Sequence, residues 1–267
     1  MKTKKLIVLT SILIFSGCSM KVAENKSGEN RQDNKDLLMA TLYQQRAAEY
    51  DALTYQAFNA AKKALHDDMK VMGLTRRQCI VVDIDETLLD NSPYQAECIL
   101  ENISYPERWD EWINSASCES VPGALEFLNF ASENGYEIFY VTNRKEKFRK
   151  PTLENLKKAG FPNPVDDHLL MRTETSSKQA RRDNISENYK ISMLIGDNLN
   201  DFTDVFYKAP LQKRFALVDS LRNEFGQRFI ILPNAMYGSW VDAIFEYQSG
   251  LSEAEMDSLM MNALEGF

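Results

Sequence analysis

Short apolar runs alternate with helical patterns along most of the chain. Runs of this kind are typical of strands buried on both faces of a parallel sheet. They lie at residues 80–82, 137–141, 168–171, 191–195, 215–218 and 229–232. Between them, Pro122 begins a helical pattern that stops at Asn134-Gly135, and a second pattern over residues 147–159 stops at Gly160. Strands that alternate with helices predict an α/β fold built from βαβ units.

Further helices are predicted outside this alternation. Apolar residues recur at intervals of three and four from Leu37 to Met69, which indicates one long or two consecutive amphipathic helices closed by Gly73. Residues 94–118 lack a strand pattern and are expected to form a partly helical insertion. Ser252 and Glu255 form a capping-box pair that predicts a C-terminal helix. These segments, about 36–72, 92–120 and 240–267, would form a smaller helical region beside the sheet.

The N-terminal residues have the pattern of an export signal. Lysines precede an apolar run over residues 6–15, which is too short to span a bilayer and ends in Gly17-Cys18. We expect residues 1–17 to be a lipoprotein signal peptide, Cys18 to be lipidated with chains such as palmitate, and residues 18–35 to be a flexible tether. The alternative is an ordinary signal peptide with an incidental cysteine. The expected location is outside the cytoplasm on a bacterial membrane, the outer membrane if the organism has two.

Composition limits the classes of partner and site. The chain of 267 residues has a net charge of -8, which argues against nucleic-acid binding. A small anionic substrate would therefore need local positive charge. Two histidines leave little material for a zinc site. Cys98 and Cys118 could form a disulfide in an exported protein, or both could be unpaired core residues. The oligomeric state stays open between a monomer and a homodimer.

Two acids follow the first predicted strand directly. Side chains alternate along a strand, so Asp83 and Asp85 would lie on the same side, at the carboxyl edge of the sheet. This edge is where open α/β sheets bind ligands. Two close carboxylates repel each other unless a cation or a division of roles separates them. The pair therefore predicts a cation site and an anionic substrate.

Other strand ends carry polar residues suited to phosphoryl transfer: Thr142, the segment around Lys178, and Asp197 with Asp201. One carboxylate can attack phosphorus, and a second can protonate the leaving oxygen and later activate water. A hydroxyl and an ammonium can hold the phosphoryl oxygens. Asp83 and Asp197 could hold a hard divalent cation, with Asp201 orienting the ligands from further out.

Two other interpretations of the acidic stretches fit poorly. A helix-loop-helix calcium loop starting at Asp197 would place Leu199 at its third position and would lack a glycine at its sixth. A Walker loop is excluded because no glycine-rich segment precedes a Lys-Ser or Lys-Thr pair.

The motifs resemble those of a known superfamily. The four motifs of the haloacid dehalogenase (HAD) superfamily are similar to Asp83-x-Asp85-x-Thr87, Thr142, Lys178 and Gly196-Asp197-x-x-x-Asp201. More narrowly, residues 82–94 together with residues 196–202 resemble the paired signature of bacterial class C acid phosphatases, which include lipoprotein 5′-nucleotidases. The resemblance covers the chain from about Ala40 onward. It implies a HAD-like Rossmannoid core, a parallel sheet flanked by helices, within a domain over residues 36–267.

The resemblance also implies roles for individual residues. Asp83 would be the nucleophile and Asp85 the general acid and base, with Thr142 and Lys178 binding phosphate. Mg²⁺ would lie on the Asp83 carboxylate, the Asp85 backbone carbonyl and Asp197. The remaining substrate-binding residues would be Asn143, Arg144, Trp109 and Tyr237, of which the last two would sandwich a nucleotide base or simply pack the structure.

We therefore expect a magnesium-dependent acid phosphatase that hydrolyses phosphomonoesters, nucleoside 5′-monophosphates among them, through an aspartyl-phosphate on Asp83. Two alternatives remain. A phosphotransferase would use the same intermediate, and a surface lipoprotein could bind a nucleotide or another ligand without turnover. The intact set of acids and Lys178 disfavours the second alternative, because a binder gains nothing from a nucleophile.

Overall fold

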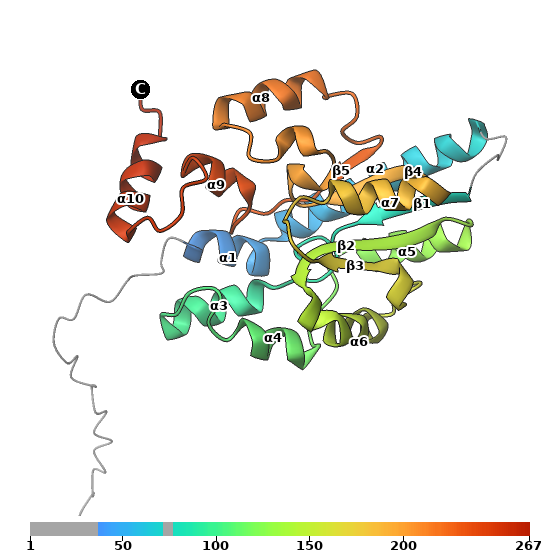
Figure 1. Cartoon of the computed structure of the whole chain (residues 1–267), viewed down its shortest axis with the longest axis horizontal. Coiled ribbons are helices and arrows are strands. Elements are labelled where there is room, and N and C mark those ends of the chain that lie inside the picture. Colours follow the sequence, from blue (N-terminus) through green and yellow to red (C-terminus); the bar gives the residue numbers. More distant parts are fainter. Residues whose placement is uncertain (1–36, 72–76) are drawn as a thin grey trace, which may run out of the picture. The chain divides into compact units, whose positions relative to one another are not determined.

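A five-stranded parallel sheet forms the centre of the protein in a computed structural model, which describes residues 37–71 and 77–267. The strand order is β3-β2-β1-β4-β5 (Figure 1). The strands are β1 (Arg77–Val82), β2 (Glu137–Lys145), β3 (Leu169–Arg172), β4 (Tyr189–Gly196) and β5 (Phe229–Ile231). All four neighbouring pairs are parallel. The predicted α/β class with a parallel sheet is confirmed.

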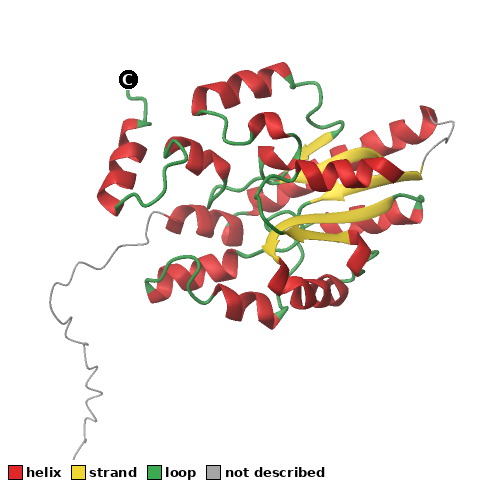
Figure 2. Cartoon of the chain, in the orientation of Figure 1, coloured by secondary structure: helices red, strands yellow, loops and turns green. Residues whose placement is uncertain are grey.

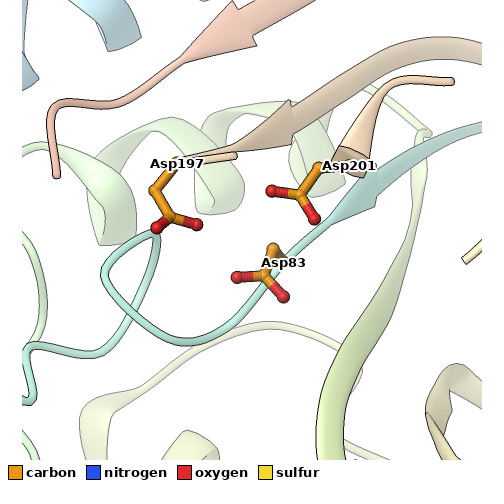
Figure 3. A group of neighbouring side chains, drawn as sticks. All are labelled: Asp83, Asp197 and Asp201. Atoms are coloured by element: carbon orange, nitrogen blue, oxygen red, sulfur yellow. The ribbon is translucent and has the colours of Figure 1, made fainter. Parts of the chain in front are cut away.

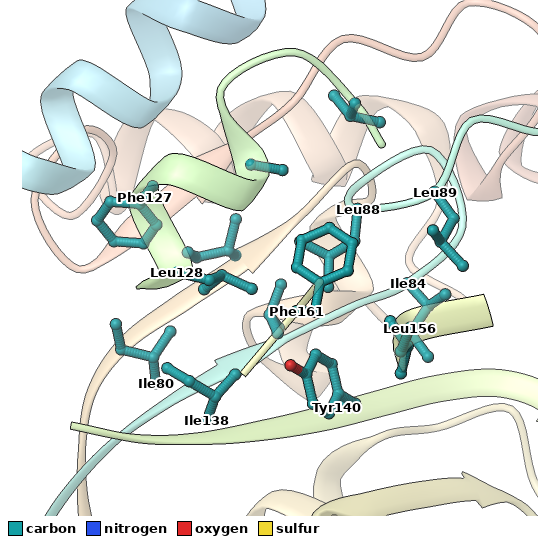
Figure 4. Packing of buried hydrophobic residues seen from close by; sticks show 14 of the residues in the cluster. Ile80, Ile84, Leu88, Leu89, Phe127, Leu128, Ile138, Tyr140, Leu156 and Phe161 are labelled. Atoms are coloured by element: carbon teal, nitrogen blue, oxygen red, sulfur yellow. The ribbon is translucent and has the colours of Figure 1, made fainter. Parts of the chain in front are cut away.

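The apolar run of β1 supplies both faces of the sheet, as its lack of polar alternation predicts. Ile80 and Val82 lie in the larger buried cluster, whereas Cys79 and Val81 lie in a second, smaller one. Figure 4 shows Ile80 of β1 and Ile138 of β2 packed beneath Leu128 in the larger cluster. The central position of β1 therefore follows from its burial on both sides.

The flanking helices divide between these two clusters. The larger cluster includes residues of α2 (Ala48–Val71), α5 (Ala124–Glu133) and α6 (Arg149–Ala159). The smaller cluster includes Ile185 of α7 (Gln179–Asn188), together with Phe202. Phe58, Ala61 and Leu65 of α2 are almost completely buried, so this predicted amphipathic helix contributes directly to the main core.

Other helices surround the carboxyl edge (Figure 2). The N-terminal pattern forms two helices, α1 (Leu38–Arg46) and α2, and the insertion after β1 contains α3 (Ser92–Glu101) and α4 (Trp109–Ser115). Residues of α1 and α3 contact each other. The remaining elements are η2 (Glu146–Phe148), η3 (Asp166–His168), η4 (Leu199–Asp201), η5 (Asp204–Phe206), α8 (Leu211–Ser220), α9 (Ser239–Ile244) and α10 (Glu253–Asn262). The predicted capping box of α10 is present, since Ser252 and Glu255 bind each other's backbone amides.

Two sequence predictions were wrong in detail. Residues 215–218, predicted as a strand, belong to helix α8, which begins after Pro210. Phe215 is 66% exposed, so this apolar run does not mark a buried strand. An apolar run of four residues cannot by its period distinguish a strand from a helix. The helix predicted from Pro122 begins at Ala124, because Gly123 before it adopts a left-handed backbone with φ of 86°.

The structure also answers whether Cys118 forms a disulfide with Cys98. Cys118 is a free thiol, so the disulfide between Cys98 and Cys118 is not formed. The predictions for the signal peptide, Cys18, the tether and the helix end at Gly73 fall outside the described residues. In the described ranges, no helix is both long enough and apolar enough to cross a membrane.

Candidate active site

The ends of β1 and β4 bring two acids together across the middle of the sheet. The two strands pair up to Val82 and Ile195, and the Asp83 amide extends this pairing by donating to Ile195 O at 2.9 Å. Asp83 therefore lies beside Asp197, which follows β4. Carboxylate oxygens of Asp83, Asp197 and Asp201 all lie within 4.8 Å of one another, and Figure 3 shows the three side chains converging.

The position of Asp201 depends on a glycine and on a turn. A Cβ atom at Gly196 would lie 2.2 Å from Asp201 Oδ2, so only glycine permits this close approach. Asn198 caps the short helix η4, its side chain accepting from Asn200 N while its own backbone amide donates to Asp201 Oδ2 at 3.0 Å. The Gly-Asp-Asn sequence thus directs Asp201 back toward the end of β1.

Lys178 supplies the positive charge among these acids. It precedes helix α7, its side chain is only 5% exposed, and Nζ forms ion pairs with Asp83 Oδ1 and, at 2.6 Å, with Asp201 Oδ1. Burial opposes a charge on this amine, but Asp201 and Asp83 outweigh burial and raise the pKa of Lys178. The ammonium is therefore held protonated where an anionic group would approach Asp83.

One lysine does not balance three carboxylates. Burial is the main cause that raises the pKa of Asp83 to about 7, helped by Asp201 and Asp85 and opposed by Lys178. The pKa of Asp197 is also well above its ordinary value, through burial and then through Asp201 and Asp83. A further cation at this place would stabilise the ionised forms of both acids.

Asp85 lies in different surroundings. Its Oδ1 accepts hydrogen bonds from Arg144 Nη2 at 2.8 Å, Arg144 Nε at 3.0 Å and Asn91 Nδ2 at 2.8 Å. The Arg144 side chain is 1% exposed, and its Nη1 donates to Thr152 Oγ1 at 3.2 Å. Burial opposes the charge of Arg144, yet the ion pair with Asp85 raises its pKa. Arg144, predicted to bind substrate, is thus committed to Asp85 in this structure, and its contact with substrate stays a prediction.

Glu86, Asn91 and Trp112, for which no role was predicted from the sequence, stabilise the turn that carries Asp85. Glu86 is fully buried with a left-handed φ of 55°, a backbone conformation that is unfavourable for a residue with a Cβ. Asn91 N donates to Glu86 Oε1 at 2.7 Å, and Trp112 Nε1 donates to Asn91 Oδ1 at 2.8 Å. Glu86 and Asn91 lie within the signature resemblance, which was the only sequence signal for them. Nothing in the sequence connected Trp112 with the site.

The predicted phosphate-binding residues on β2 lie at the same edge. Thr142 is completely buried, and its Oγ1 accepts from Arg144 N at 3.0 Å. Arg181 donates to Thr142 O at 2.6 Å, to Asn143 Oδ1 at 2.8 Å and to Ser177 O at 2.9 Å. Arg181 therefore ties the end of β2 to the segment that carries Lys178. No pattern in the sequence indicated this structural role of Arg181.

The two predicted base-binding aromatics lie in different elements. Trp109, at the start of α4, is partly buried and packs edge-on against Tyr94 and Tyr105. Tyr237 lies in the segment after β5, where Asn234 Oδ1 accepts from its amide at 3.4 Å. Asn234 Nδ2 also donates to Asp197 Oδ2 at 2.8 Å, which ties the Tyr237 segment to the acidic cluster. Among the aromatic pairs of the described residues, the rings of Trp109 and Tyr237 do not contact each other.

The donor set fits a hard divalent cation. The three clustered side chains offer only carboxylate oxygens, which magnesium and calcium prefer to nitrogen or sulfur. Both oxygens of Asp201 have close partners, Lys178 at 2.6 Å and the Asn198 amide at 3.0 Å. Asp83 Oδ1 also pairs with Lys178, but Asp83 Oδ2 has only a 3.5 Å bond from Thr87 Oγ1, so Asp83 and Asp197 are the better direct ligands. The outer position expected for Asp201 stays a prediction.

A parallel sheet with a buried acid, a lysine and a cation-type carboxylate cluster at its carboxyl edge is the arrangement expected of proteins that act on phosphoryl groups. Solved structures support this class. The chain is similar to the class C acid phosphatase of Bacillus anthracis, solved with and without tungstate. The match has a TM-score of 0.85 and 37% identity, and it covers 88% of this chain and 98% of that one.

Curated relatives and a family model agree with this likeness. Acid phosphatase 1 of Solanum lycopersicum is 28% identical over 49% of this chain and 54% of its own length. The stem 31 kDa glycoprotein of Glycine max is 30% identical over 55% of this chain and 57% of its own length. The chain thus spans about half the length of the curated relatives it matches. The model of the HAD superfamily, subfamily IIIB (acid phosphatase), matches residues 19–240, and the chain belongs to this family.

Proposed function

We propose that this protein is a magnesium-dependent acid phosphatase that hydrolyses small phosphomonoesters through an aspartyl-phosphate on Asp83. One observation carries the proposal: two acids that are two residues apart have separate sets of partners. Asp83 lies with Lys178, Asp197 and Asp201, whereas Asp85 is held by Arg144 and Asn91. Covalent phosphoryl transfer needs this division, because one carboxylate must attack while the other moves a proton.

In the first step, a carboxylate oxygen of Asp83 attacks phosphorus and the bond to the ester oxygen breaks. Lys178, which precedes α7, and the Thr142 hydroxyl of β2 would bind the phosphoryl oxygens. Lys178 would turn from its ion pair with Asp83 toward the incoming phosphate. The chain has a negative net charge, so a small anionic substrate needs local positive charge. Lys178 would supply that charge directly at the nucleophile.

Asp85 would give its proton to the departing ester oxygen, so that an alcohol leaves. A water molecule then attacks phosphorus, Asp85 takes up the proton of that water, and the bond between phosphorus and Asp83 breaks. Free phosphate and the original two carboxyl groups result, so the cycle balances. The side chain of Asp85 is 20% exposed, which gives it the access to substrate and water that this function requires.

Asp83, the backbone carbonyl of Asp85, and Asp197 would hold Mg²⁺, and Asp201 would orient the site through its bond to the Asn198 amide. When bound, the ion would neutralise charge between the carboxylates and the phosphate dianion. The raised pKa of Asp83 and of Asp197 supports this assignment, since both acids would be ionised more readily beside a divalent cation.

Nucleoside 5′-monophosphates are the substrates we favour. Trp109 and Tyr237 belong to segments bound to the site, Trp109 through α4, which also carries Trp112, and Tyr237 through Asn234. Such rings can stack on a nucleobase. The tungstate bound to the similar Bacillus anthracis enzyme is a tetrahedral oxyanion like phosphate, which agrees with a phosphate-binding site here.

The test is phosphate release from a panel of nucleotides, sugar phosphates and 4-nitrophenyl phosphate, with Mg²⁺ and with a chelator. We expect release that depends on Mg²⁺ and is fastest for the nucleotides. Asp83→Asn should lower turnover by at least about 10⁴-fold, since it removes the nucleophile. Full turnover in this variant, or no release from any ester by the native protein, would refute the proposal. Transfer of phosphate to an added alcohol in place of water would identify a phosphotransferase.

We also propose that the protein is exported and anchored through lipidated Cys18. The support is the basic and apolar pattern that ends at Gly17-Cys18. In a bacterial host, the native chain should fractionate with membranes and incorporate labelled palmitate. Cys18→Ala should lose the label, and membrane association that persists without it would contradict the proposal.

A further inference from the structure

The two oxygens of the Asp85 carboxylate have unequal partners. Oδ1 accepts from Asn91 Nδ2 at 2.8 Å, from Arg144 Nη2 at 2.8 Å and from Arg144 Nε at 3.0 Å. Within the described part of the chain, Oδ2 accepts only a longer bond of 3.2 Å from the same Arg144 Nε. A carboxylate oxygen has two lone pairs, so Oδ1 is saturated and Oδ2 retains room for a proton.

The orientation of the Asn91 amide follows from its neighbours. Trp112 Nε1 can only donate, and it lies 2.8 Å from Asn91 Oδ1. The amide nitrogen must then face the acids, where it binds Asp85 Oδ1 and, at 3.2 Å, Glu86 Oε2. The opposite orientation would set N–H against N–H and oxygen against two carboxylates. Asn91 is fully buried, so water cannot take the place of any of these partners.

Trp112 is held firmly enough to fix this orientation. It lies on α4, whose next residue, Ile113, is 1% exposed in the main core. On the other side of Asn91, the backbone amide is bound to Glu86 Oε1 at 2.7 Å. The relay from Trp112 through Asn91 to Asp85 is therefore rigid at both ends, and it starts in the insertion.

We propose that Asn91, oriented by Trp112, is a positioning residue that occupies Oδ1 of Asp85 and leaves Oδ2 as the atom through which the proton moves. The inference rests on the proposed function and deepens it. Oδ2–H would give its proton to the ester oxygen as the bond from phosphorus to that oxygen breaks. Without the relay, Asp85 would keep only its bonds to Arg144, which reach both of its oxygens, so the carboxyl could rotate or protonate at Oδ1, and protonation of the leaving group would suffer.

Leaving groups of different strength can detect this loss. The second-order rate constant kcat/KM reports the steps up to departure of the alcohol. 4-Nitrophenolate leaves without help, whereas an alkoxide needs its proton during bond breaking. In Trp112→Phe we expect kcat/KM to fall about 10- to 100-fold for glycerol 2-phosphate. For 4-nitrophenyl phosphate the loss should stay below about 3-fold, since that ester needs little general acid catalysis.

Controls separate positioning from packing. Trp240→Phe changes a tryptophan that is 41% exposed on α9 and should leave both rate constants unchanged. Because Trp112→Phe could fail to fold, a second variant replaces the indole of Trp112 by benzothiophene, which keeps the ring shape but removes the N–H. It should show the same selective loss. Equal losses for both esters, or none, would overturn the relay.

A double variant gives an independent check. In an Asp85→Asn background the added change Trp112→Phe should have no further effect on the alkyl ester, since the two residues act on one step. Additive losses would contradict the proposal. If Asp85→Asn itself fails to favour the aryl ester, the acid role in the proposed function is wrong. That result is distinct from a failure of the relay alone.

Discussion

Asp83 and Asp85 are two residues apart in the sequence and differ most in how their charge is balanced. Around Asp83, three carboxylates share one lysine, and the pKa values of Asp83 and Asp197 are raised. Around Asp85, one carboxylate meets a buried arginine and an amide. The first surroundings are short of positive charge and are suited to a cation. The second are balanced without one.

Because their charges are balanced in different ways, the two acids should respond differently to the same perturbation. Removing charge from the group around Asp83 should change cation binding and pH dependence. Changing Asp85 should alter the rate of turnover and leave the cation in place. Four predictions test this contrast.

Among these four predictions, the largest effect is expected for Asp85→Asn. The amide keeps the shape of the side chain but cannot transfer the proton, so kcat should fall about 10²- to 10³-fold, within the range of lost general acid catalysis. Its Mg²⁺ affinity, measured by isothermal titration calorimetry, should stay near the native value, since only the backbone carbonyl of Asp85 is assigned to the ion. Strongly weakened Mg²⁺ binding would remove the contrast between the two acids.

Lys178→Met should lower the free energy of unfolding of the metal-free protein by about 3 kcal/mol, because it leaves buried acids without their cationic partner. Denaturant titration at pH 7 measures this loss. Lys63→Met is a matched control: Lys63 pairs with Asp67 at 3.0 Å, but its side chain is 75% exposed. The control should change the free energy by less than about 0.5 kcal/mol. Similar losses in both variants would show that the buried ion pairs of Lys178 contribute no more to the free energy of unfolding than an exposed ion pair does.

Asp197→Ala should weaken Mg²⁺ binding about 10- to 100-fold, comparable to the loss of a supporting ligand. Isothermal titration calorimetry under the same conditions compares the Mg²⁺ affinity of Asp197→Ala directly with that of Asp85→Asn. Asp204→Ala is a useful control because Asp204 is acidic and nearby in the chain but binds Ser177 Oγ at 2.7 Å. Equal weakening in Asp197→Ala and Asp85→Asn would contradict the division of duties.

The last prediction concerns pH. The pKa of Asp83 rises from an ordinary 3.8 to about 7, so the native state binds a proton more tightly than the unfolded chain does. Stability from this group is therefore fully present below about pH 4 and is lost as pH rises toward 7. Metal-free protein should lose stability over this window, as followed by thermal unfolding. Mg²⁺ at a hundred times its dissociation constant should add about 2.7 kcal/mol at pH 7. A loss of stability that Mg²⁺ does not reverse would show that a group other than Asp83 causes the pH dependence.

Much of the fold could be predicted because its signals are local. Apolar runs located the five strands, and the capping pair Ser252 and Glu255 located the start of α10. The prediction failed at residues 215–218, where a run of four was too short to show its period. For the site, the order of the polar strand ends was enough to expect that Asp83, Lys178 and Asp197 would meet. Their catalytic roles stay predictions.

The sequence by itself determined the parallel α/β architecture, the family and the acids at the carboxyl edge, because each is written in short segments. Only the tertiary structure decided which groups hold each acid. Arg144 reaches Asp85 from 59 positions away, and Lys178 reaches Asp83 from 95. Trp112 reaches Asn91 only because α4 folds back over the turn that carries Asp85. The physical reason is that charge balance and hydrogen-bond direction depend on neighbours in space, which a pattern along the chain does not specify.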